Sequence, residues 1–176
     1  RGCLAGPVIS AAVILKQGIN LKLLRDSKKI SFKKRQEISD YIKLHSIYAI
    51  GVASVDEILD LNILQASLLS MKRAVEKLPV KPDLTLIDGN FTPSGLKNCK
   101  TIINGDEKVK VISAASIIAK VYRDKFMIKL AQEFSDYAWE SNFGYGTKAH
   151  LEGLKKFGIT SHHRKGFKPV HKILSN

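Results

Sequence analysis

The sequence is poor in cysteine, in acidic residues and in long apolar runs. Its two cysteines, Cys3 and Cys99, supply neither a disulfide framework nor a metal-binding spacing, and they suit a reducing compartment. No apolar run approaches the roughly 20 residues of a membrane span, and "PVISAAVIL" lacks the layout of a signal peptide. We find no repeat and no low-complexity tract. These absences exclude a disulfide-stapled secreted module and a membrane protein, and we expect a cytoplasmic protein.

Positive charge is what the chain has in excess. Lys and Arg number 29 against 16 Asp and Glu, which gives a formal net charge of +13 at pH 7. A fold does not need this excess, whereas a polyanionic partner does. The basic residues cluster in two runs, 25–35 and 161–172. One such run can be a plain solvated face, but two runs with this net charge favour nucleic acid. Neither run has the apolar face of a membrane-binding helix.

Apolar patterns predict strands that alternate with helices. We expect strands in "GPVISAAVIL", "SIYAIGVAS", residues 84–87 and "KTIING", and helices in "SFKKRQEISDYIKLHS", "LNILQASLLSMKRAVEKL", "VISAASIIAKVYRDKFMIKLAQEF" and "TKAHLEGLKKFG", the last followed by a basic tail. Ser31 is a candidate N-cap. Ser54 and Glu57 form a capping box, and its helix is expected to restart near Asn62. This order predicts one α/β domain over residues 1–176, with a mixed central sheet flanked by helices.

Two carboxylates follow the ends of short strands. Asp88 closes the buried run 84–87, and Asp106 comes just after "KTIING". Asp-Gly is also a common turn pair, so Asp88 alone could be only a turn residue. If the two strands are neighbours, both acids lie at one sheet edge, where ligands of open α/β sheets bind. Paired acids that face a polyanion require a divalent cation such as Mg²⁺ or Mn²⁺, which bridges carboxylate and phosphate oxygens.

Longer motifs resemble a known family. "RGCLAGPV", "DSKK", "LNILQASLLSMKRAV", "DGN", "NGD", "SAASIIAKVYRD", "GYGTKAHLEGL" and "HHRKGF" occur in the order seen in bacterial ribonuclease HII, over essentially the whole chain. The resemblance implies a ribonuclease-H-like fold and a metal-dependent endonuclease that uses Mg²⁺ or Mn²⁺, with a two-metal mechanism. Its expected substrates are RNA–DNA hybrids and duplex DNA with embedded ribonucleotides, cut to 5′-phosphate and 3′-hydroxyl ends.

The family's active site contains four acids. By resemblance Asp88 and Asp106 are the third and fourth, and they are the expected catalytic and metal-binding residues. The first two stand in an Asp-Glu-Ala-Gly-Arg-Gly motif whose last two residues match Arg1 and Gly2. We therefore expect the Asp-Glu pair, together with the first strand of the sheet, before residue 1.

Further residues match the substrate-binding positions of the family. Arg1 and Gly2 would contact the ribose 2′-hydroxyl through closely approaching backbone. Tyr145 would stack on the deoxyribose beyond the ribonucleotide and so read the RNA–DNA junction. Lys28 and Arg164 would hold phosphates.

Three other residues need an interpretation. Asp124, in "YRD", could approach the metals, and we expect it to be structural or to support the metal ligands. His162 and His163 could be mistaken for a metal pair. Oxygen-ligand chemistry and the basic surroundings instead predict phosphate proximity or plain surface for them.

Two alternatives stay open at this point. One is a non-catalytic nucleic-acid-binding relative that has lost its acids, and the other is a different ribonuclease-H-like nuclease such as a DNA-junction resolvase. The residues before Arg1 separate the first alternative from the enzyme, and a 2′-hydroxyl requirement separates the second. We expect a monomer, and the sequence names no protein partner.

Overall fold

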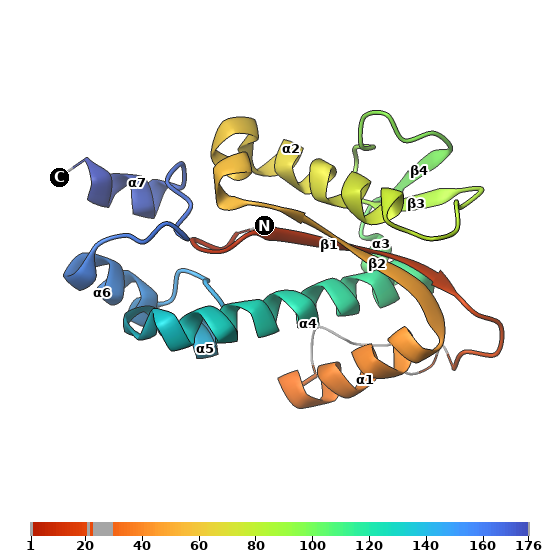
Figure 1. The fold of residues 1–176 in the computed structure, drawn as a ribbon, viewed down its shortest axis with the longest axis horizontal. Helices are drawn as coiled ribbons and strands as arrows, with labels where there is room; N and C mark the ends of the chain where they lie inside the picture. Colours follow the sequence, from red (N-terminus) through yellow and green to blue (C-terminus); the bar gives the residue numbers. More distant parts are fainter. Residues whose placement is uncertain (1, 21, 23–29, 176) are drawn as a thin grey trace. The chain divides into compact units, whose positions relative to one another are not determined.

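The computed structural model describes residues 2–20, 22 and 30–175 (Figure 1). The strands and helices in chain order are β1 (Val8–Leu15), α1 (Phe32–Leu44), β2 (Ser46–Ala53), α2 (Val55–Glu76), β3 (Thr85–Asp88), β4 (Cys99–Ile102), α3 (Gly105–Lys108), α4 (Lys110–Glu133), the 3₁₀ turn η2 (Ser135–Tyr137), α5 (Trp139–Asn142), α6 (Lys148–Phe157) and α7 (Lys168–Leu174). In the described ranges, no helix is both long enough and apolar enough to cross a membrane.

The chain forms two compact units. Unit 1 consists of the described parts of Arg1–Val8, Ala53–Ser67 and Tyr122–Asn176, and unit 2 of those in Ile9–Val52 and Leu68–Val121. The long helices α2 and α4 contribute residues to both units. The single domain predicted from the sequence remains a prediction.

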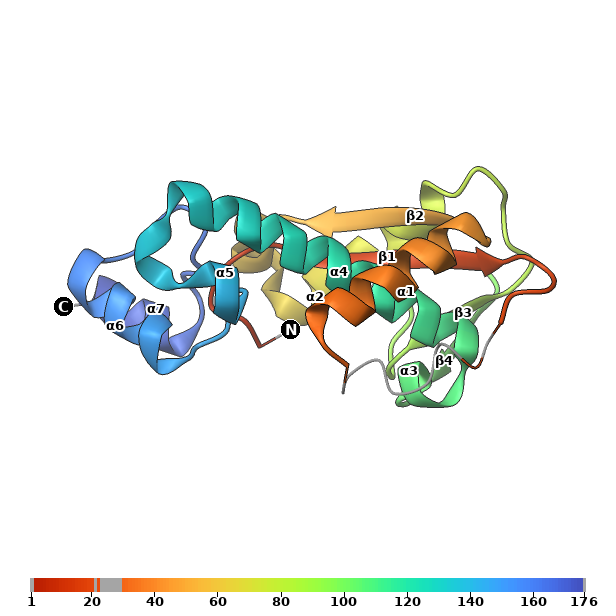
Figure 2. The same ribbon diagram turned by 90° about the horizontal axis from the view of Figure 1, so that it is seen from below.

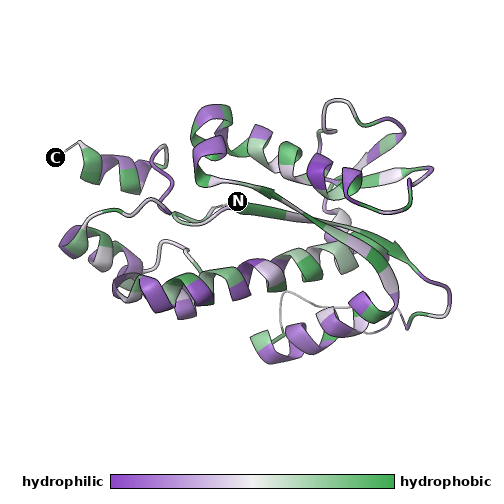
Figure 3. Ribbon diagram, viewed as in Figure 1, coloured by the Kyte–Doolittle hydropathy of each residue, from purple (hydrophilic) through white to green (hydrophobic). Residues whose placement is uncertain are grey.

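In unit 2, β1 and β2 form a two-stranded sheet, and Figure 2 shows their arrows running in opposite directions. Helices cover one face of this sheet through an apolar cluster. Ile38 and Ile42 of α1 lie one turn apart and pack with Ala114, Ile117 and Ile118 of α4, and apolar residues of β1 and β2 pack against them. Figure 3 shows β1 and β2 mostly in the hydrophobic colour, whereas polar and apolar residues are mixed along α1.

The C-terminal part of α2 lies close to β2. A Cβ at Gly51 of β2 would collide with the carbonyl oxygen of Ser70 and with the backbone nitrogen of Ala74, so only glycine permits this approach. The Ser10 and Ser70 hydroxyls lie 2.6 Å apart, and Arg73 donates to the Val52 carbonyl at 2.8 Å. The antiparallel pair is therefore flanked by helices, as the sequence predicts.

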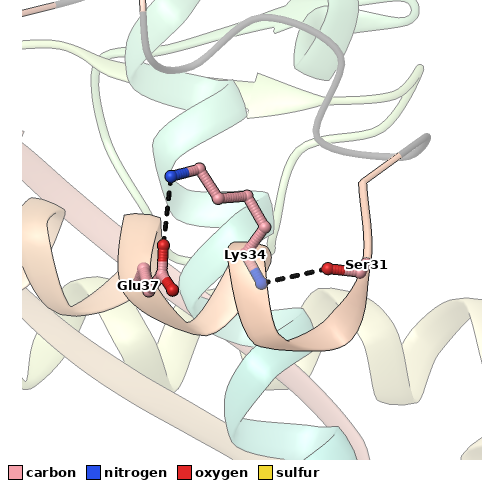
Figure 4. Close-up of polar contacts among 3 residues, drawn as sticks. All are labelled: Ser31, Lys34 and Glu37. Carbon is pink, nitrogen blue, oxygen red and sulfur yellow. Dashed lines mark hydrogen bonds and ion pairs between the residues drawn. The ribbon is translucent and has the colours of Figure 1, made fainter.

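The start of α1 confirms the predicted N-cap. The Ser31 hydroxyl accepts a hydrogen bond from the backbone N–H of Lys34 at 3.3 Å, and the Lys34 ammonium lies 3.0 Å from the Glu37 carboxylate (Figure 4). The cap satisfies one of the unpaired donors of the first turn. The ion pair is solvent-exposed and contributes little to stability.

A second pair of strands in unit 2 is parallel. β3 pairs with β4 in the register Thr85 to Cys99 through Asp88 to Ile102. Both strand orientations of the predicted mixed sheet are thus present. Within the described ranges, however, the two pairs form separate two-stranded sheets. Sequence patterns identify strands, but the choice of which edges pair depends on contacts far apart in the chain.

The capping signals predicted for α2 are present in unit 1. The Ser54 N–H donates to Glu57 Oε2 at 2.8 Å, and the Glu57 N–H donates to Ser54 Oγ at 3.1 Å. The helix restarts at Asn62, whose φ of 70° and ψ of 165° are not helical. The Asn62 side chain then accepts from the N–H groups of Leu64 and Gln65, and so caps the second segment.

Unit 1 has its own apolar core. Leu4 and Ala5 pack with Met127 of α4, and the cluster also contains Ala131, Tyr137, Trp139, Leu154 and Val170. Val170 belongs to α7, so the basic tail expected after α6 is in fact a helix with one buried side. The one-turn elements α3, η2 and α5 were also not predicted.

Candidate active site

The acid pair of unit 2 lies where two parallel strands end. Asp88 is the last residue of β3 and is in register with Ile102, the last residue of β4. The carboxyl ends of both strands therefore meet at one edge, and Asp106 follows four residues after Ile102, in the one-turn helix α3. The predicted neighbour relation between the two strands is confirmed.

A direct hydrogen bond joins the two loops. The backbone N–H of Gly105 donates to Asp88 Oδ1 at 2.8 Å, which places the residue before Asp106 against the Asp88 carboxylate. A Cβ at Gly105 would lie 2.7 Å from Ile112 Cδ1, the end of a flexible side chain, and 3.4 Å from Asp88 Oδ1, so the backbone of Gly105 lies close to both side chains. Asp88 and Asp106 are both half-buried. Because a carboxylate has about four lone-pair sites, this bond orients Asp88 and leaves it capacity for a cation.

The donor set is small and consists of oxygen atoms. No group of three or more His, Cys, Asp or Glu side chains gathers in the part of the chain that the structure describes. Two carboxylates suit a hard cation such as Mg²⁺ or Mn²⁺, but they do not fill its coordination shell. These residues fit part of a metal site.

In unit 1, Tyr145 presents a partly exposed ring. The side chain is 43% exposed, and the guanidinium of Arg123 lies 6.0 Å from the ring centroid. Burial and the neighbouring Cys3 thiol, to which the hydroxyl is hydrogen-bonded, raise the Tyr145 pKa. The buried Asp124 carboxylate also raises it, whereas Arg123 opposes the shift. Tyr145 is therefore a neutral phenol at a partly exposed position.

Gly2 lies in the same unit as Tyr145 and is exposed. A Cβ built on Gly2 would meet no protein atom within 4 Å, so packing inside the protein does not require glycine at this position. Arg1 and Lys28, the other predicted contacts from the N-terminal part of the chain, lie outside the described residues.

Arg164 does not have the environment expected of a phosphate ligand. It is 2% exposed, and its guanidinium donates to the backbone carbonyls of Gly6 at 2.9 Å and Pro7 at 3.2 Å. Burial lowers its pKa to about 10, which leaves it charged at neutral pH. This geometry supports a role in holding the N-terminal segment. A run of charged residues predicts exposed side chains. Arg164 is buried instead, because the backbone carbonyls of Gly6 and Pro7 need hydrogen-bond donors.

His163 also departs from its expected surface position. It is fully buried, whereas its neighbour His162 is half-buried. The exposed cations of the run 161–172 are Lys165, Lys168 and Lys172. The run 161–172 therefore exposes fewer cationic side chains than its sequence suggests.

The fold identifies the class of protein. The chain superimposes on the crystal structure of ribonuclease H2 from Pyrococcus horikoshii OT3 with a TM-score of 0.80, at 24% identity over 99% of this chain and 93% of the other. Ribonuclease HII from Archaeoglobus fulgidus, solved in complex with PCNA, gives a TM-score of 0.73 at 25% identity over 98% and 91% of the two chains. The protein is therefore an α/β protein with the ribonuclease-H-like fold.

The sequence comparisons define the family. The Ribonuclease HII family profile matches residues 1–171. Ribonuclease HII from Pelagibacter ubique is 58% identical over 176 residues, which cover 99% of this chain and 94% of that protein. The chain belongs to the ribonuclease HII family. The fold class, the family and the enzyme class predicted from the sequence, a ribonuclease H of type 2, are thus confirmed.

Proposed function

We propose that this protein is an endoribonuclease that cuts RNA–DNA hybrids and cuts at ribonucleotides embedded in duplex DNA, leaving 5′-phosphate and 3′-hydroxyl ends. The observation that carries the proposal is the parallel pairing of β3 with β4, which sets Asp88 against the residue before Asp106. It occurs in a chain of the ribonuclease HII family with a net charge of +13, which suits a nucleic-acid substrate.

Asp88 and Asp106 would hold the divalent cations, for which Mg²⁺ and Mn²⁺ fit the oxygen donors. When bound, such ions supply positive charge to the scissile phosphate and acidify a bound water. The Gly105 N–H keeps one Asp88 oxygen in place, so the carboxylate does not have to reorganise. We propose that the Asp-Glu pair of the family motif, expected before residue 1, completes the ligands.

Tyr145 and the Arg1-Gly2 backbone would recognise the ribonucleotide and its junction with DNA. The partly exposed Tyr145 ring is available for stacking on a sugar, and its hydroxyl is held by Cys3. The open space at Gly2 leaves the backbone accessible to a 2′-hydroxyl. Asp124 is fully buried and acts electrostatically on Tyr145, so we assign it a structural role.

Phosphate binding would fall to Lys28 and to exposed lysines of both basic runs, such as Lys33 and Lys165. The contribution of Arg164 would be indirect, through the N-terminal segment that it holds. We further propose that the protein acts as a monomer in the cytoplasm, with residues 1–176 as its catalytic domain. We propose no protein partner.

The test compares two duplexes that differ by one oxygen atom. The full-length protein with Mg²⁺ should cut a DNA duplex that carries one ribonucleotide and leave the all-DNA duplex intact. Equal cutting of both would contradict the 2′-hydroxyl requirement and favour a DNA-junction nuclease. Binding of both without cutting would indicate a non-catalytic relative.

A further inference from the structure

A buried chain of hydrogen bonds runs through unit 1. Trp139 of α5 donates from Nε1 to His150 Nε2 at 3.1 Å, and His163 Nε2 lies 3.0 Å from the same atom. At one end, His150 Nδ1 is 2.9 Å from the carbonyl oxygen of Tyr145. At the other end, His163 Nδ1 lies 2.9 Å from the Thr160 N–H nitrogen and 3.0 Å from the Thr160 hydroxyl. Trp139 and both histidines are fully buried.

The hydrogen bonds assign the proton positions of both imidazoles. A carbonyl oxygen only accepts, so His150 carries its proton on Nδ1 and exposes a lone pair on Nε2. That lone pair faces Trp139 Nε1–H and His163 Nε2, so His163 must be the Nε2–H tautomer. His163 Nδ1 is then an acceptor for Thr160. Two neutral rings with opposite tautomers fit every bond of this network, with the one lone pair of His150 Nε2 shared between Trp139 and His163. A further proton on either ring would remove an acceptor from the network.

This hydrogen-bond network connects two segments that carry proposed substrate contacts. His150 is bonded to the carbonyl of Tyr145 itself. His163 forms a backbone bridge with Ala5 and precedes Arg164, whose guanidinium holds the carbonyls of residues 6–7. The loop with the proposed junction-reading ring and the segment that follows Gly2 therefore rest on one polar network.

The neighbouring loop reinforces this arrangement. The carbonyl of Gly144, next to Tyr145, accepts from the N–H groups of Leu4 at 2.7 Å and Ala5 at 3.3 Å. A Cβ at Gly144 would lie 2.8 Å from the Ala5 carbonyl oxygen. A shift of the Tyr145 backbone would therefore also displace the N-terminal segment.

Burying two imidazoles is unfavourable compared with an apolar core. Burial lowers the pKa of His150 and lowers that of His163 to about 3, which shows how strongly the site rejects a charged ring. Tyr137 and Trp139 already supply aromatic packing around both histidines. Packing alone thus gives no reason for a histidine at position 150, whereas its directed hydrogen bonds to Tyr145, Trp139 and His163 do.

We propose that His150 is a positioning residue, locked as its Nδ1–H tautomer by His163 and Trp139, that orients Tyr145 for recognition of the RNA–DNA junction. This inference rests on the proposed function of Tyr145. Its consequence is a selective defect. Loss of the bond should impair cutting at a single embedded ribonucleotide, which presents only one such junction, more than cutting within a continuous RNA–DNA hybrid, which offers many other sites.

Two variants of His150 separate the bond from the packing. In His150→Asn the amide nitrogen takes the place of Nδ1 and can still donate to the Tyr145 carbonyl. In His150→Gln the amide reaches the place of Nε2, so contact with Trp139 and His163 survives and the bond to Tyr145 is lost. We expect the ratio of kcat/KM for the single-ribonucleotide duplex to that for the hybrid to fall about fivefold in His150→Gln and to stay near wild type in His150→Asn.

His45 provides a matched control in unit 2. Its Nδ1 donates to the Tyr41 carbonyl at 2.8 Å, the same kind of bond, and His45→Gln should leave the ratio unchanged. In a double-mutant cycle, His150→Gln should add no further loss of ratio to Tyr145→Ala. An equal ratio in His150→Gln and wild type, while Tyr145→Ala lowers it, would overturn this inference alone. An unchanged ratio in Tyr145→Ala would instead contradict the proposed role of Tyr145.

A second measurement needs no variant. Nitrogen-15 NMR of the wild-type imidazoles should show a proton on Nδ1 of His150 and on Nε2 of His163. A proton on Nε2 of His150 would remove the bond to Tyr145 and overturn the inference, even if the His150 variants fail to fold.

Discussion

Acidification should destabilise unit 1 through His163. Burial, and then the nearby His150 and His162, lower the His163 pKa from 6.5 to about 3. The folded state therefore keeps this ring neutral, while the unfolded state takes up a proton below pH 6.5. The contribution of His163 to the free energy of unfolding is fully present above pH 6.5 and is lost as the pH falls from 6.5 toward 3.

The magnitude follows from the two pKa values. Between pH 7.5 and pH 5, protonation of the unfolded chain at His163 alone lowers the free energy of unfolding by about 2 kcal/mol. His150, whose pKa is also lowered by burial, adds to this loss in the same direction. Other groups titrate in this range as well, so the test requires a comparison of pH differences rather than of single stabilities.

The chain contains its own probe. Its single tryptophan, Trp139, is fully buried and hydrogen-bonded to His150, so its fluorescence reports on this network. Urea unfolding at pH 7.5 and pH 5 should be measured for wild type and His163→Gln, which no longer titrates there. We expect the loss on acidification to be about 2 kcal/mol smaller in the variant, although the variant is less stable at pH 7.5. An equal loss in both proteins would refute the reasoning.

Three further predictions concern single side chains. Arg164→Lys, which loses the planar fork that holds the N-terminal segment, should lower stability by about 1–3 kcal/mol in urea unfolding and leave the salt dependence of duplex binding unchanged. Lys165→Ala should leave stability unchanged and reduce the slope of log affinity against log salt concentration by about 1. A reduced slope in Arg164→Lys would instead show that Arg164 contacts a phosphate directly. Asn62→Ala should lower the free energy of unfolding by about 1–2 kcal/mol, because it removes the cap of the second α2 segment and strains a positive φ. Asn62→Gly should lower it by only a few tenths of a kcal/mol. Equal losses of stability in thermal unfolding of the two variants would contradict this.

Local signals in the sequence were sufficient for much of the secondary structure. Ser31, the Ser54–Glu57 box and the restart at Asn62 act on backbone groups within three residues, so their effect can be predicted from neighbours alone. The acid pair could also be predicted from the sequence. Both acids follow strand ends, and pairing of two sequential strands brings such residues to the same edge of a sheet. β3 and β4 do pair in this way.

Contacts between segments far apart in the sequence could not be predicted in this way. Arg164 is drawn to carbonyls more than 150 residues earlier in the chain, and no local pattern marks that pairing. His150 and His163 belong to different segments, and their bond appears only in the fold. Helix α7 did carry a signal, since a proline in its first turn precedes Val170 and Ile173 at helical spacing. The basic composition of the run concealed it.

Cleavage by Asp88→Asn tests the central claim that the acids at the end of β3 and after β4 perform the chemistry. The substitution keeps size and turn preference and removes one negative charge. Single-turnover cleavage and binding of a one-ribonucleotide duplex should be measured in Mg²⁺ for wild-type and variant full-length protein. We predict a loss of turnover of about a hundredfold or more, with affinity changed by less than about threefold, because affinity rests on phosphate contacts elsewhere. Near-normal cleavage by the variant would contradict the account and leave Asp88 as a turn residue.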